Sequence, residues 1–208
     1  MTFTRRTALT LIASLSAWPA LAQLPPDDAA LVEKARDCLL RITSAIGRFT
    51  QVDPSGRSAT GMIYLKRPGR ARFEYDPPSG LVVASNGFRV AVLNRRLATL
   101  DAYPLGATPL GVLLSRDIRI DKDVAIGAVT RRPGGFSIVA WESKKHNEGQ
   151  IALDFSDAPV ALLGWTITNA QGAATRVSLI DFAPSKPLPN SFFELKPDTP
   201  PAHRPPVG

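Results

Sequence analysis

The chain has 208 residues, a formal net charge of +7 and 44% hydrophobic residues. This length suits one domain with a proper core, and the single cysteine, Cys38, excludes an internal disulfide. The positive charge suits an anionic lipid surface or an acidic partner. The lack of a basic cluster interleaved with aromatic residues argues against nucleic acid.

The first 22 residues are expected to be a cleaved export signal and not part of the fold. Arg5 and Arg6 precede an uncharged, mostly apolar run, and Ala20-Leu21-Ala22 is a cleavage site of the A-x-A type. The run is shorter than the roughly 20 apolar residues of a bilayer span. The paired arginines leave open whether export uses the Sec or the twin-arginine route. Because Gln23 and not a cysteine follows the cleavage site, we expect a periplasmic protein without a lipid anchor.

A helix is predicted to begin at Asp27 or Asp28 and to end at Gly47. Pro26 stands just before the start, and Asp28 is a suitable N-cap. The opposite, charged face is expected to meet solvent. The apolar residues recur at helical spacing: Leu31, Ala35, Cys38, Leu39, Ile42 and Ile46.

After Gly47 the hydrophobic period falls to two residues, which is typical of strands. In the clearest stretch, 70–76, apolar residues point to one face and charged residues to the other. Asn86-Gly87 is a strong two-residue hairpin signal. So many short strands predict a large antiparallel sheet, sandwich or barrel with one apolar and one wet face. The strands are expected at 70–76, 81–85, 88–93, 97–102, 124–130, 136–141, 150–155, 162–168, 175–182 and 192–195.

Two further segments complete the predicted organisation. A short helix lying on the sheet is expected at 109–114, where the leucines have helical spacing. From Pro197 the chain is rich in proline and is expected to be extended or disordered. We therefore divide the chain into a signal peptide (1–22), one folded domain (23–197) and a Pro-rich tail (198–208).

The sequence offers no support for catalysis. The histidines are His146, in a charged turn, and His203, in the tail, so no catalytic residue, metal site or cofactor is expected. Cys38 lies on the apolar helix face, which favours packing over nucleophilic attack.

The most specific stretch of the chain is GMIYLKRPGRARFEYDPP at 61–78. It follows Phe49-Thr50-Gln51 and precedes Ser85-Asn86-Gly87, the apolar segment 109–114 and the closing stretch 192–197. In this order the motifs resemble those of the LolA family of periplasmic lipoprotein carriers, whose F-x-Q stands at the end of the first helix. Ala91 departs from the pattern, because the family often has a tryptophan there.

The resemblance implies a mainly β (α+β) fold. This is a curved, unclosed antiparallel β-barrel covered by an N-terminal amphipathic helix and a short lid helix. It implies a non-enzymatic periplasmic chaperone that shields the acyl chains of lipoproteins in an apolar cavity and moves them from the inner to the outer membrane. The implied partners are acylated lipoproteins, an inner-membrane lipoprotein-releasing ABC transporter and an outer-membrane LolB-like receptor. A carrier that visits two membranes is expected to be a monomer.

Alternate apolar residues of two strands and the underside of the lid are the candidates for a lipid-binding cavity. Plain core packing is the competing interpretation, because cores and cavity walls use the same residue types. In the resemblance, Arg67 is a latch that hydrogen-bonds to lid backbone; otherwise it is a solvated strand-end residue. The cavity candidates are Ala71, Phe73, Tyr75, Val90, Val92 (or else Phe88, on the same alternate set), Leu110, Leu113 and Leu114.

Other functions remain open from the sequence. A general periplasmic lipid- or glycolipid-binding protein, or a lipid sensor of the same fold, would use the same residues. Such sensors generally carry a second domain, for which this chain has little room. A β-rich periplasmic hydrolase would need a nucleophile–base pair, which the sequence does not show.

Overall fold

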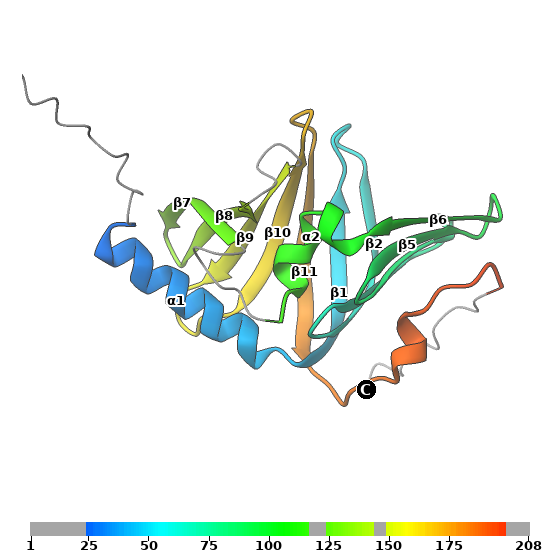
Figure 1. Cartoon of the computed structure of the whole chain (residues 1–208), viewed down its shortest axis with the longest axis horizontal. Coiled ribbons are helices and arrows are strands. Elements are labelled where there is room, and N and C mark those ends of the chain that lie inside the picture. The colour runs from blue at the N-terminus through cyan, green and yellow to red at the C-terminus, as the bar shows by residue number, and fades with distance from the viewer. Residues whose placement is uncertain (1–23, 117–123, 144–148, 199–208) are drawn as a thin grey trace, which may run out of the picture.

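A single curved antiparallel sheet dominates the computed structural model, which describes residues 24–116, 124–143 and 149–198 (Figure 1). Its strands are β1 (Ser44–Val52), β2 (Ser58–Lys66), β3 (Arg70–Tyr75), β4 (Leu81–Asn86), β5 (Arg89–Asn94), β6 (Thr99–Pro104), β7 (Val124–Arg132), β8 (Gly135–Glu142), β9 (Gly149–Ser156), β10 (Leu162–Asn169) and β11 (Ala174–Pro184). The helices are α1 (Pro26–Arg41) and α2 (Leu110–Leu114), with single 3₁₀ turns η1 (Leu105–Ala107) and η3 (Asn190–Phe193).

The strand order is β6-β5-β4-β3-β2-β1-β11-β10-β9-β8-β7. Strands adjacent in sequence pair with each other, except that β6 and β7 lie at opposite ends, and β1 pairs with β11 to join the two halves. Within the described residues, the outer sides of β6 and β7 are free. The predicted mainly β fold, a curved and unclosed antiparallel barrel with two helices, is confirmed.

The prediction that the first helix continues to Gly47 is wrong. The helix α1 ends at Arg41, where the Ile42 amide bonds back to the Leu39 carbonyl, and β1 begins at Ser44. Ile46, which extended the helical period, lies in β1, as does Phe49-Thr50-Gln51. Because β1 is hydrogen-bonded to β2 on one side and β11 on the other, this pairing outweighs a local helical spacing.

The main hydrophobic core lies on the concave face of the sheet, under the two helices. The helix α1 contributes Val32, Ala35, Cys38 and Leu39 to it. It runs along the half of the sheet that contains β7 to β10, and Arg131 on β7 forms an ion pair of 2.6 Å with Asp28 (Figure 1). The amphipathic helix predicted from the sequence therefore covers the sheet as expected.

The alternation predicted that the convex face is exposed to solvent, but part of this face is covered. A C-terminal strap (residues 185–196) returns along the convex side of β2 to β5. The guanidinium of Arg72 donates to the Phe192 carbonyl at 2.7 Å and lies 4.5 Å from the centre of the Phe192 ring. Residues 192–195 were expected to form a strand, but Phe192 and Phe193 belong to η3, because their rings pack onto this face instead of alternating.

The strap and the strands beneath it form a second, smaller core. Val82, Ala84 and Leu93 are buried here, although they alternate with the residues of the concave face. Tyr64 meets the Phe192 ring at 4.9 Å, and Phe193 is only 1% exposed. Strands β2 to β5 are thus packed on both faces.

Three expectations cannot be placed on this fold. The signal peptide (1–22), His146 and, apart from Asp198, the Pro-rich tail with His203 lie outside the described residues. In the part of the chain that the structure describes, no helix is long and apolar enough to cross a bilayer.

Removing the Phe193 ring should destabilise the protein strongly. We expect Phe193→Ala to lower the free energy of unfolding by about 3–5 kcal/mol, because it empties a buried aromatic site. The control is Phe88→Ala, whose side chain is 79% exposed, and its effect should stay within about 0.5 kcal/mol. Urea unfolding followed by circular dichroism measures both. Equal losses in the two variants would mean that the strap does not form this core in solution.

Candidate functional site

The expected cavity residues of the strands lie in rows across the concave face. Residues that face each other on neighbouring strands share a face of the sheet. One row joins Ile63, Phe73, Val83 and Val92. The next joins Leu65, Ala71, Ser85 and Val90. Ala71, Phe73 and Val90 are buried in the main core, whereas Val83 and Val92 are half-buried.

The underside of α2 occupies the space above these rows. Leu110, Leu113 and Leu114 are buried in the same hydrophobic cluster as Ala71, Phe73 and Val90. We call residues 105–115, which include η1 and α2, the lid segment. The concave face is therefore covered by side chains of the protein itself.

Phe88 does not join this set. It lies in the turn between β4 and β5, where its amide donates to Asn86 Oδ1 at 3.0 Å and its side chain is 79% exposed. Gly87 precedes it with a φ of +103°, a backbone conformation that favours glycine. Because the turn includes Gly87 and Phe88, β5 begins only at Arg89. Of the two possibilities that the alternation left open, the structure places Val90 and Val92, and not Phe88, on the concave face.

Arg67 connects the ends of both helices. Its Nη1 donates to the Leu39 carbonyl near the end of α1, and its Nη2 donates to the Ser115 carbonyl just after α2 at 2.6 Å. Carbonyl groups at helix C-termini carry partial negative charge and attract a cation. The backbone of the same turn adds a bond of 2.8 Å from the Gly69 amide to the Leu114 carbonyl.

The Arg67 side chain is only partly satisfied in this position. Its Nε is buried and has no hydrogen-bond partner among the described residues. Burial also lowers the pKa of the guanidinium below its ordinary value. An unpaired buried donor costs about 1–3 kcal/mol, which offsets part of what the two carbonyl bonds contribute.

A polar pair lies in the otherwise apolar concave face. The Tyr75 hydroxyl donates to Gln51 Oε1 at 2.6 Å, and the Tyr75 ring meets Phe49 edge-on at 5.1 Å. Burial raises the pKa of Tyr75 to about 12, and the bond to Gln51 opposes this only in part. The sequence motif included Gln51 but assigned it no role, because only the fold brings β1 and β3 to the two sides of β2.

Trp165 is a further concave residue that the sequence reasoning missed. Its ring lies 6.0 Å from Phe73 and is almost fully buried. The alternation within 162–168 predicts on which face of its strand Trp165 lies. It does not predict that the ring contacts Phe73, which lies in the other half of the sheet. Cys38 lies in the same core, where burial raises the pKa of its thiol and keeps it protonated.

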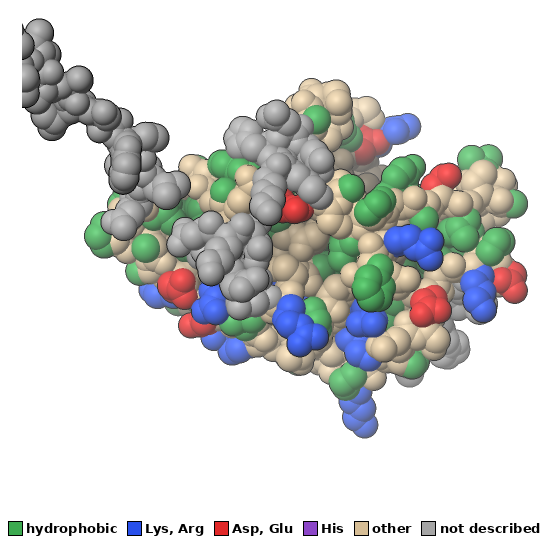
Figure 2. Space-filling model, viewed as in Figure 1, with side chains coloured by type: hydrophobic (Ala, Val, Ile, Leu, Met, Phe, Trp, Pro, Cys, Tyr) green, Lys and Arg blue, Asp and Glu red, His purple; other side chains and the backbone are tan. Residues whose placement is uncertain are grey.

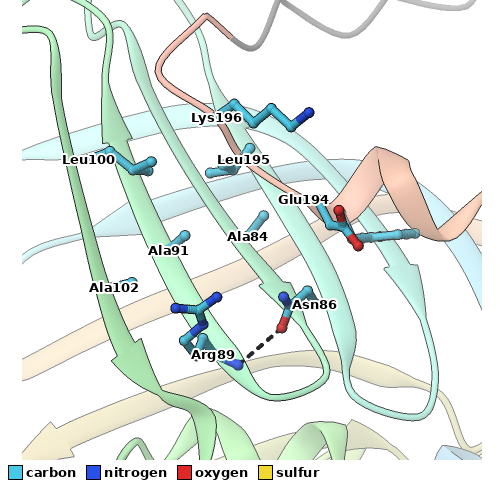
Figure 3. Close-up of a pocket in the computed structure, with 10 residues that line it drawn as sticks. Ala84, Asn86, Arg89, Ala91, Leu100, Ala102, Glu194, Leu195 and Lys196 are labelled. Atoms are coloured by element: carbon cyan, nitrogen blue, oxygen red, sulfur yellow. Dashed lines mark hydrogen bonds between the residues drawn. The ribbon is translucent and has the colours of Figure 1, made fainter.

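A cavity of about 200 Å³ lies on the opposite, convex face (Figure 3). Its floor consists of small side chains from β4 to β6, and the strap residues Glu194, Leu195 and Lys196 form one side. Arg89 lies at the end near the β4–β5 turn, where its amide donates to Asn86 Oδ1 at 3.1 Å (Figure 3). The strap, and not the lid, bounds this cavity. Within the described ranges no cluster of His, Cys, Asp or Glu could hold a metal ion.

Comparison with known proteins points to one family. Residues 41–196 match the family model described as "Outer membrane lipoprotein carrier protein LolA". No curated protein matches the sequence significantly.

Several solved structures are similar to the chain at low identity. An uncharacterised conserved protein of Thermus thermophilus is 12% identical, with 83% of this chain and 95% of that chain covered and a TM-score of 0.48. A LolA superfamily protein of Nitrosomonas europaea is 10% identical, with 81% and 97% covered and a TM-score of 0.46. A putative outer membrane lipoprotein-sorting protein domain of Vibrio parahaemolyticus is 12% identical, with 80% and 97% covered and a TM-score of 0.48.

The raised pKa of Tyr75 should make stability depend on alkaline pH. An unfolded tyrosine ionises near pH 10 and folded Tyr75 near 12, so its contribution is complete below pH 10 and is lost as the pH rises toward 12. Between pH 9 and 11 we expect wild type to lose roughly 1–1.5 kcal/mol more unfolding free energy than Tyr75→Phe. Urea unfolding at both pH values measures this difference. Parallel losses in the two proteins would show that Tyr75 ionises normally.

Proposed function

This chain belongs to the LolA family of outer membrane lipoprotein carrier proteins, and from that premise we propose that it carries acylated lipoproteins across the periplasm. In this proposal the protein is exported, acts without catalysis, and takes its cargo from an inner-membrane lipoprotein-releasing ABC transporter to an outer-membrane LolB-like receptor. Family members are periplasmic and related to lipoprotein-sorting and lipid-binding proteins.

One observation supports this function most directly: part of the apolar concave face is covered by a short helix, α2. The helix α2 has five residues, too few to be stable without tertiary contacts. Its leucines pack on the concave core, and its ends are held by backbone bonds to neighbouring turns. A cover of this kind can leave without unfolding the sheet. We propose that the acyl chains then contact Ala71, Phe73, Tyr75, Val90 and Val92.

The energies of lid and cargo are comparable, which a carrier requires. Burial of the three lid leucines contributes roughly 5–9 kcal/mol at about 1.5–3 kcal/mol each. An acyl chain of about fourteen carbons gains roughly 11 kcal/mol at about 0.8 kcal/mol per CH₂. One chain can therefore replace the lid, yet the returning lid offsets most of the gain and favours release.

In this mechanism Arg67 is the latch of the closed form. It joins the carbonyls of Leu39 and Ser115 and so holds α1 and the lid segment together. Its unpaired Nε limits how tightly it can hold them. A latch of moderate strength suits a lid that must open for each cargo.

A charge on the concave face should block uptake of lipid. Val92 and Ala91 are adjacent, half-buried and on opposite faces of β5. We expect Val92→Glu to weaken binding of a synthetic triacylated lipopeptide at least tenfold, because a carboxylate then faces the acyl chains, whereas Ala91→Glu should bind like wild type. Native mass spectrometry and fluorescence titration on the mature protein measure both.

The outcomes separate the alternatives. A wild-type protein that takes up no lipopeptide would contradict the carrier function. Uptake of phospholipid or glycolipid but not of lipopeptide would instead favour a general lipid-binding protein. Loss of binding in Ala91→Glu but not in Val92→Glu would move the lipid site to the convex face.

Weakening the latch should open the lid. Arg67→Gln removes charge-assisted bonds worth about 1.5–3 kcal/mol each, so we expect hydrogen exchange in the lid segment to quicken roughly tenfold or more. Apparent affinity for the lipopeptide should rise, because more molecules are competent to bind. Arg70→Gln, in the same turn region but without a lid contact among the described residues, is the control. Unchanged exchange in Arg67→Gln would contradict the latch.

A further inference from the structure

One end of the sheet holds both ends of the lid segment through backbone hydrogen bonds. The Leu105 amide donates to the Phe88 carbonyl at 2.9 Å, which fixes the start of the segment to the β4–β5 turn. The Leu114 carbonyl accepts from Gly69 at 2.8 Å, which fixes its end to the β2–β3 turn. The helix α1 ends beside them, through the bond of Arg67 to Leu39. We call this surface, residues 39–43, 66–70, 86–89, 105 and 114–116, the lid rim.

The lid rim carries an exposed aromatic side chain on a rigid turn. Phe88 is 79% exposed, and Asn86 Oδ1 accepts bonds from the Phe88 and Arg89 amides that fix the turn. Leu40, at the last turn of α1, is also exposed, at 38%. These bonds fix the backbone of the turn, and in this position the Phe88 ring faces outward, where it meets either water or a partner.

The charge of the lid rim is of one sign. Its segments contain Arg41, Arg67, Arg70, Arg89 and Arg116 and no Asp or Glu. No ion pair of Arg41, Arg70 or Arg89 with a carboxylate is found among the described residues. Figure 2 shows Lys and Arg side chains gathered along the lower middle of the molecule, below α2 and near the end of α1.

The opposite end of the sheet differs in this respect. There Arg57 pairs with Asp53 at 2.8 Å and Arg48 pairs with Asp76. Arg48 and Arg57 are thus neutralised within the protein, whereas Arg41, Arg70 and Arg89 of the lid rim have no such pairing among the described residues and can meet an external anion. The net charge, +7 for the full chain and +5 without Arg5 and Arg6 of the expected signal peptide, adds a long-range attraction to anionic surfaces.

We propose that the lid rim docks on a membrane surface that contains anionic lipids. The Phe88 ring enters the headgroup region, where amphipathic and aromatic side chains are favoured, and the surrounding arginines contact lipid phosphates. This inference goes beyond the transport function, because it states where the protein meets the membrane and does not depend on the class of cargo.

Docking of the lid rim on a membrane would act on the lid segment. The two turns that would contact lipid are the turns that hold the two ends of the lid segment. Movement of the Phe88 turn acts on Leu105, and movement of the Gly69 turn acts on Leu114. The concave face would then open next to the bilayer, so that an acyl chain passes between protein and membrane with little exposure to water.

Vesicle binding by the mature full-length protein tests the proposal. Vesicles of phosphatidylcholine with roughly 30% phosphatidylglycerol are compared with pure phosphatidylcholine at about 0.15 M salt. We expect preferential binding to the anionic vesicles. Phe88→Ser should weaken this binding roughly tenfold or more, and Arg89→Gln roughly fivefold, with little effect on neutral vesicles.

The matched control lies at the other end of the sheet. Leu97 is 70% exposed in the β5–β6 turn, which Asn94 Oδ1 fixes as Asn86 fixes the Phe88 turn. Leu97→Ser should leave vesicle binding unchanged. Equal loss in Leu97→Ser and Phe88→Ser, or no preference of wild type for anionic vesicles, would overturn the proposal.

Lipopeptide binding in solution distinguishes this failure from failure of the transport function. Phe88→Ser should bind the lipopeptide like wild type, because Phe88 is outside the concave face. Wild type that takes up lipopeptide but does not bind vesicles would retain the carrier function and refute membrane docking, leaving a protein receptor as the docking partner. Vesicle binding without lipopeptide uptake would support membrane docking and refute the carrier function.

Discussion

The structure depends on one physical constraint: an unclosed barrel with an apolar concave face must cover that face. A closed barrel of about eight strands can fill its interior with its own side chains, but this sheet has eleven strands and is not closed. Here the sheet stays open between β6 and β7, and α1 and α2 supply the missing contacts. The two covers are not equal. The helix α1 has 16 residues with a continuous apolar face, whereas α2 has five and is held at its ends by few bonds. The weaker cover is therefore the place where the fold can open.

Packing on the convex face stabilises the strands that lie under the weaker cover, α2. The strap packs Phe192 and Phe193 against β3 and β4, and Arg72 lies between them and Glu74 as a buried charge that is fully engaged. Strands β2 to β5 consequently have apolar contacts on both sides. In the proposed transport, departure of the lid would remove their contacts on one face only, and the contacts with the strap would remain to hold the curvature of the sheet.

Much of this fold was predictable from local patterns, and the errors have identifiable causes. The alternation in 70–76 and the Asn86-Gly87 turn predicted β3 and the β4–β5 hairpin within a residue or two. The helical spacing that included Ile46 failed because β1 is the strand where the two halves of the sheet meet, a fact of long-range pairing that no local window contains. The stretch 192–195 failed for a similar reason, since its apolar residues pack on a surface formed by strands far earlier in the chain.

The candidate site was predictable in part. Period two assigned Ala71, Phe73, Val90 and Val92 to one face, and the leucine spacing identified the underside of α2. The same period could not decide about Phe88, because the positive φ of Gly87 delays the start of β5 by one residue. The pairing of Tyr75 with Gln51 required knowledge of which strands flank β2.

The open sheet also bears on self-association. A strand without a neighbour presents its backbone groups to any other strand, including the same edge of a second copy. In β6 all the side chains are exposed, Asp101 adds a charge, and Pro104 ends the strand without an amide hydrogen. In β7 a bulge between Ile126 and Ala128 distorts the ladder. The open side of the sheet is thus bordered by strands that resist edge-to-edge polymerisation.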